Sequence, residues 1–100
     1  MGAETAVVEH ALLRIEAGRE AEFEAAFAVA RDILVAAEGA GAITMSRCVE
    51  EPSTYLLQVR WDSLEAHMVA FRNSPAFGAW RGLVGPFFAQ PPQVHHFAVI

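Results

Sequence analysis

The spacing of apolar residues changes along the chain, from the two-residue period of a strand to the longer period of a helix. Residues 6–15, "AVVEHALLRI", are largely apolar on both faces of a predicted strand. Its odd positions are Val7, Glu9, Ala11, Leu13 and Ile15, and its even positions are Val8, His10, Leu12 and Arg14. Residues 19–37 instead carry apolar side chains on one face of a predicted helix. Gly39 follows, where a glycine suits the left-handed backbone that ends many helices.

Two β-rich runs follow at 42–50 and 54–61, and the short link between them contains Pro52. Two such runs on either side of a short turn are typical of a β-hairpin. Further along, residues 75–88 predict a short helical piece, and residues 94–100, "VHHFAVI", predict a terminal strand. The chain therefore supplies four strands.

Between the hairpin and that helical piece, residues 62–73, "DSLEAHMVAFRN", predict a second main helix. Asp62 or Ser63 is its expected N-cap, and Pro75 marks its end. Its apolar stripe is Leu64, Met68 and Phe71. His67 lies one step from this stripe, at its edge, so an imidazole is expected beside the buried side of the helix.

The order strand, helix, strand, strand, helix, strand predicts the ferredoxin-like α+β fold, an antiparallel four-stranded sheet with both helices on one face. The other face of the sheet must then be polar or meet a partner. Because the first and last predicted strands are apolar on both sides, we expect a second copy of the chain there. Two sheets packed face to face make a dimeric α/β barrel.

Composition strengthens the expectation of a homodimer. Apolar residues make up 54% of the 100 residues and charged residues only 19%, below the typical charged share of about 25%. A single domain of residues 1–100 has more apolar surface than so short a chain hides. The formal net charge of −5 argues against nucleic acid and anionic membranes as partners. The lone Cys48 forms no internal disulfide, which fits the cytoplasm.

Several segments together resemble the antibiotic biosynthesis monooxygenase family. They are "LLRIEAGREAEFEAAF" (12–27), a strand ending in Trp61, "DSLEAHMVAFRNSPAF" (62–77), Trp80, "PFF" (86–88) and a terminal strand of the form P-x-V-x-x-F. The resemblance covers about residues 6–100 and implies the dimeric barrel fold. The family includes cofactor-independent monooxygenases that turn hydroxyaromatics into quinones, haem-degrading enzymes, and an isomerase of a signalling sugar phosphate.

The haem-degrading branch requires a Trp three residues before the Ser of its second helix and a His seven residues after it. Counted from Ser74, those positions hold Phe71 and Arg81, so haem cleavage is not expected. His95 and His96 are adjacent on a strand and therefore point to opposite faces, which prevents them from forming a metal-binding pair alone. We expect no metal site and no cofactor.

Two histidines are candidate general bases, since an imidazole titrates near neutral pH. His67 lies on the edge of an apolar stripe, where the alternative is a half-exposed helix residue. His10 lies within an apolar strand, where it is either a satisfied buried group or part of the lining of a pocket.

Aromatic residues predict a binding site for a small, flat, apolar ligand. Tyr55, Trp80 and Phe71 are the candidate substrate contacts, together with His96 if it faces the pocket. The alternative for each aromatic residue is an ordinary place in the core, which we favour for Trp61 and Phe77.

These observations favour a monooxygenase that needs no metal or flavin. O₂ reacts directly only with a substrate that supplies an electron, and a hydroxyaromatic does so once a base has removed its proton. Two other classes remain open. One is a non-catalytic dimeric scaffold that holds a small ligand, and the other is an isomerase or cyclase that acts on a small carbonyl compound.

Overall fold

The computed structural model describes residues 5–100 and has the predicted order of main elements. These are β1 (Val7–Arg14), α1 (Glu20–Val35), β2 (Ala40–Arg47), β3 (Thr54–Trp61), a π-helix (Ala66–Phe71), α2 (Pro75–Val84), a short 3-10 helix (Gly85–Phe87) and β4 (Gln93–Ala98). The strands form one antiparallel sheet in the order β2-β3-β1-β4. The α+β ferredoxin-like fold is therefore confirmed.

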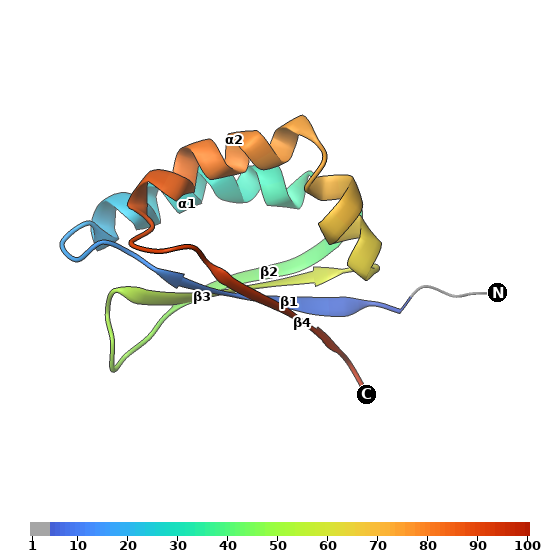
Figure 1. Ribbon diagram of the computed structural model, residues 1–100, viewed down its shortest axis with the longest axis horizontal. Coiled ribbons are helices and arrows are strands. Elements are labelled where there is room, and N and C mark those ends of the chain that lie inside the picture. The colour runs from blue at the N-terminus through green and yellow to red at the C-terminus, as the bar shows by residue number, and fades with distance from the viewer. Residues whose placement is uncertain (1–4) are drawn as a thin grey trace.

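The helices cover one face of the sheet and leave the other uncovered (Figure 1). α1 buries Phe23, Ala30 and Leu34 at helical spacing, as its amphipathic pattern predicts. α2 buries Trp80 and Val84. The core lies between these helices and the inner face of the sheet.

The register of β1 decides which of its side chains meet the helices. Glu9 pairs with Val59 on β3 and with His96 on β4. Its neighbour His10 pairs with Gln58 and with His95. Because successive side chains on a strand point to opposite faces, Glu9 and His96 lie on the helix side, and His10 and His95 on the uncovered side.

Gly39 has a φ of +85°, which confirms the left-handed turn expected after α1. A Cβ at this position would lie 2.9 Å from the Cβ of Ala66. The glycine therefore allows the end of α1 to pack closely against the start of the π-helix. Ser63 accepts a hydrogen bond from the backbone N–H of Ala66 at 3.1 Å, which supports Ser63, one of the two predicted caps.

The predicted inward stripe of the second helix is wrong for two of its three residues, Leu64 and Met68, and correct for Phe71. Leu64 and Met68 are 48% and 38% exposed, whereas His67 is only 4% exposed and is buried with Phe71. The stripe predicts an ordinary α-helix, but residues 66–71 form a π-helix. The imidazole is therefore on the inner side of the helix, with Phe71 four residues later.

The uncovered face of the sheet carries apolar side chains as well as polar ones. Phe97 on β4 is 52% exposed and packs against His10, with ring centroids 4.6 Å apart. Leu12 and Leu56 are cross-strand partners on the same face and are only partly buried. We propose that a second copy of this chain covers this face. No helix within residues 5–100 is long and apolar enough to cross a membrane.

A dimer through this face should bury on the order of 1,500 Å² in total. Replacing Phe97 by Lys places a charge there and should weaken the dimer, as measured by sedimentation velocity across a concentration series. Val29→Lys is the matched control, because Val29 is also exposed but lies on α1. A folded wild-type monomer at micromolar concentration would contradict the proposal.

Candidate functional site

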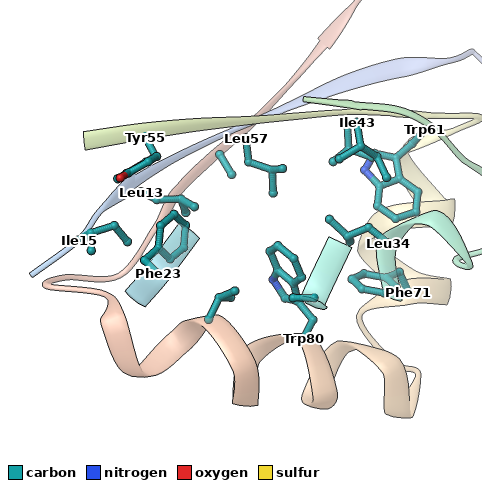
Figure 2. Close-up of a cluster of buried hydrophobic side chains, with 14 residues drawn as sticks. Leu13, Ile15, Phe23, Leu34, Ile43, Tyr55, Leu57, Trp61, Phe71 and Trp80 are labelled. Carbon is teal, nitrogen blue, oxygen red and sulfur yellow. The ribbon is translucent and has the colours of Figure 1, made fainter. Parts of the chain in front are cut away.

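A cavity of about 270 Å³ lies between the sheet and the helical layer. Its apolar walls include Leu57 from the sheet and Leu34, Phe71 and Trp80 from the helices. In Figure 2 the ring of Trp80 points from α2 toward the sheet. Four polar residues also line the cavity, namely Glu9, His67, Arg72 and Arg81. A small, mostly apolar space with a few convergent polar groups is typical of a ligand site.

Glu9 places a carboxyl group on the inner face of β1, where it is only 5% exposed. The indole Nε1–H of Trp61 donates a hydrogen bond to its Oε1 at 2.9 Å. Burial raises the pKa of Glu9 above 4.5, because a charged carboxylate is poorly solvated there. The Trp61 hydrogen bond and the charge of Arg72 lower the pKa and offset part of this rise.

His67 connects the carboxyl of Glu9 to a second imidazole. Its ring stacks on the indole of Trp61, with centroids 4.8 Å apart and planes 13° from parallel. Its Nε2 lies 3.5 Å from Oε1 of Glu9, and its Nδ1 lies 2.7 Å from Nε2 of His96. The three titratable groups therefore form a continuous chain.

Burial, together with the charges of His96 and Arg72, lowers the pKa of His67 to about 4. Burial also lowers the pKa of His96. At neutral pH both imidazoles are therefore uncharged. A neutral imidazole has one N–H and one acceptor nitrogen, so one ring donates to the other in the short contact between His67 and His96. A proton delivered to any member of the chain has neighbours to which it can move.

Arg72 reaches this cavity because the helix before it is a π-helix. In an α-helix, a residue five positions on lies about 140° around the axis. In the π-helix the N–H of Arg72 instead donates to the carbonyl oxygen of His67 at 3.1 Å, closing the wider i→i+5 turn. This turn brings Arg72 toward the side of the helix that carries His67, and both residues line the cavity.

The structure brings together four of the six predicted site residues. His67, Phe71 and Trp80 line the cavity, and His96 contacts His67. Tyr55 lies elsewhere in the core, where its hydroxyl donates to Oε2 of Glu24 at 2.6 Å. His10 lies on the uncovered face, and its Nε2 is 3.1 Å from Nε2 of Gln58. The sheet separates His10 from the cavity.

Sequence reasoning missed Glu9 and Arg72. Glu9 had a readable signal, since it is the one charged residue among the inward positions of β1. An acidic residue on an otherwise apolar strand face is either a solvated residue or a functional one. Arg72 had no comparable signal, because its position depends on the π-turn.

Residues 6–83 match the family described as antibiotic biosynthesis monooxygenase. The chain belongs to the antibiotic biosynthesis monooxygenase family. A crystal structure of a candidate monooxygenase of this family from Bordetella bronchiseptica superposes with a TM-score of 0.93 at 42% identity, covering 97% of this chain and 99% of that one. The uncharacterized protein YczJ of Bacillus subtilis is 41% identical over 91% of this chain and 96% of its own length.

The resemblance in sequence to this family is thus confirmed. SnoaB, a cofactor-independent oxygenase from Streptomyces nogalater, shares the fold, with a TM-score of 0.82 at 19% identity over 96% of this chain and 94% of its own. Within residues 5–100, no group of three or more His, Cys, Asp or Glu side chains is arranged to hold a metal ion.

The raised pKa of Glu9 predicts how its replacement changes stability. Below pH 4.5 the carboxyl is protonated in both the folded and the unfolded chain. As pH rises through the raised folded pKa, the unfolded state loses its proton first, and the stability that Glu9 contributes is lost. Gln retains the acceptor for Trp61 without the charge. Glu9→Gln should therefore raise Tm relative to wild type more at pH 8 than at pH 4.

Thermal unfolding followed by circular dichroism at the two pH values measures this difference, and about 1 kcal/mol corresponds to 4–8 °C in a domain of this size. Glu65→Gln is the control, because Glu65 is exposed and does not line this cavity. A Glu9→Gln protein that loses more stability at pH 8 than at pH 4 would show that the ionised carboxylate stabilises the fold.

Proposed function

We propose that this protein is a cofactor-independent monooxygenase that oxidises a small hydroxyaromatic to a quinone with O₂. The observation that carries the proposal is the pair Glu9 and His67, an acid–base couple inside an apolar cavity. Membership of the monooxygenase family supports it. The apolar walls suit both an aromatic ring and O₂.

The reaction begins when the Glu9–His67 pair takes the hydroxyl proton of the substrate. The resulting phenolate transfers one electron to O₂, and the two radicals combine to form a carbon–oxygen bond. The peroxide takes the proton back from the pair. The pair then removes the hydrogen at that carbon as a proton while the O–O bond breaks. One oxygen atom remains as the quinone carbonyl and the other leaves as water, so the substrate supplies all the electrons.

The pair acts as a unit, because two titratable groups this close share their protons. Glu9 is the better proton acceptor of the two, since burial raises its pKa toward the working range, whereas the pKa of His67 falls to about 4. The ring of His67 is stacked against Trp61, and it connects Glu9 to His96. A proton held by the pair is thereby kept close to the substrate.

The same pair also suits a proton shift in a small carbonyl compound, which is the chemistry of an isomerase or cyclase. The two reactions differ in their need for O₂. A scaffold that only binds its ligand would consume no O₂ and convert no substrate.

Oxygen uptake with a panel of anthrones, naphthols and hydroquinones, without added flavin or metal, tests the function. Because the pair acts as a unit, His67→Ala and Glu9→Gln should each lower turnover by about 10²–10⁴-fold, the usual contribution of a general base. His67→Gln is a second variant that keeps a polar side chain if the Ala variant folds poorly.

His10→Ala is the matched control, since His10 is a histidine on the same strand as Glu9 but on the opposite face. We expect it to retain wild-type turnover. Loss of activity in His10→Ala together with full activity in both His67 variants would assign the base to His10. No uptake across the panel would leave the binding or isomerase functions.

A further inference from the structure

Two arginines line the cavity, and neither forms an ion pair with a carboxylate of residues 5–100. The guanidinium carbons of Arg72 and Arg81 lie 5.6 Å and 5.9 Å from the centroid of the Phe77 ring. Neither side chain makes a hydrogen bond or an ion pair with any of residues 5–100. The Nε of Arg72 is buried and has no acceptor. A buried donor without an acceptor costs free energy unless a ligand supplies one.

The charges around the cavity do not balance. Arginine stays protonated in proteins, so Arg72 and Arg81 contribute two positive charges. Among residues 5–100, Glu9 carries the only carboxyl that lines the cavity, and its single negative charge, even when it is ionised, does not balance two guanidinium groups. His67 is neutral. The cavity is therefore positive in a chain whose formal net charge is −5.

We propose that the cavity binds an aromatic carboxylate, whose acid group is held by Arg72 and Arg81 while its ring lies among the apolar walls. The planar guanidinium of arginine matches a carboxylate and donates two parallel hydrogen bonds to it. In terms of the proposed function, the substrate is then a hydroxylated aromatic acid. That identification rests on the oxygenase proposal, but binding of the carboxylate does not.

The dimensions and exposure of the site agree with this ligand. An apolar cavity of about 150 Å³ holds one benzene molecule, so about 270 Å³ accommodates a fused two-ring compound. Arg81 is exposed and lies at the rim with Pro91, whereas Arg72 is half-buried. A carboxylate entering past Arg81 therefore reaches Arg72 further inside.

Binding of the anion would also act on the acid–base chain. The positive charge of Arg72 lowers the pKa of Glu9, His67 and His96. A carboxylate paired with Arg72 offsets this charge. The pKa values of the chain then rise, and the Glu9–His67 pair becomes a stronger proton acceptor when the ligand is in place.

The test compares 2-naphthoate with 2-naphthamide, two ligands of nearly the same shape that differ in charge. Isothermal titration calorimetry of the full chain at pH 7.5 and low salt should give at least about tenfold tighter binding of the naphthoate. This comparison needs no variant, so it holds even if a substitution disturbs the fold. Equal affinities, or no binding of either compound at millimolar concentration, would overturn the proposal.

Arginine variants test whether Arg72 and Arg81 cause the preference for naphthoate over naphthamide. Arg72→Met should weaken naphthoate binding by about tenfold or more and change naphthamide binding less than twofold, and Arg81→Met should have a smaller effect because its charge is exposed. Arg31→Met is the matched control, since it removes the same charge from an exposed position on α1, away from the cavity lining and from the proposed dimer face. A naphthoate preference that survives both cavity variants would overturn the assignment.

The outcome for the anion site is separable from that for the oxygenase. Neither naphthoate nor naphthamide has a phenolic hydroxyl, so the titration measures binding without chemistry. Selective naphthoate binding without oxygen uptake on any substrate would retain the anion site and refute the monooxygenase. Oxygen uptake with neutral naphthols, combined with equal binding of the two probes, would support the monooxygenase and refute the anion site.

Discussion

The buried carboxyl group of Glu9 is the constraint on which the rest of the site depends. A carboxyl on the inner face of a strand is costly unless polar groups surround it. The indole N–H of Trp61 supplies one hydrogen bond, and the same indole ring carries His67 stacked on its face. His67 in turn requires a partner for its other nitrogen, which His96 provides from β4. One acidic residue thus brings β1, β3, β4 and the π-helix into a single polar network, at the wall of an otherwise apolar cavity.

The π-helix is the second requirement, because it determines which side chains of the segment face inward. The sequence pattern suggests Leu64 and Met68 as buried residues, yet both are exposed. Two polar side chains, His67 and Arg72, line the cavity instead. A π-helix is less favourable than an α-helix and occurs often at functional sites. The π-helix therefore leaves apolar side chains exposed and places an imidazole and a guanidinium at the cavity.

Features of the fold that depend on the local spacing of apolar residues were predictable from the sequence, whereas features that depend on distant parts of the chain were not. The strands and α1 follow from local periodicity, which is why their order and pairing were predictable, and Gly39 has the conformation that its place after a helix suggests. The place of His67, Phe71 and Trp80 beside the cavity was predictable, because they are polar or aromatic residues on helices that cover the sheet. The face of His10 depends on the parity of the strand register, and a shift of one residue reverses it. Tyr55 lies on the inner face as expected, but its position along β3 places it against Phe23 and Glu24 rather than in the cavity.

The charge distribution links these local features to the chemistry. The positive charge of Arg72 lowers the pKa of both Glu9 and His67, so without a ligand it opposes the proton that the pair would accept in the proposed reaction. An anion at Arg72 removes this opposition. In the proposed reaction the Glu9–His67 pair would therefore be a stronger proton acceptor when a carboxylate ligand occupies the cavity. In the oxygenase we propose, such coupling would tie proton removal to substrate binding, and apolar walls rather than water would surround the phenolate.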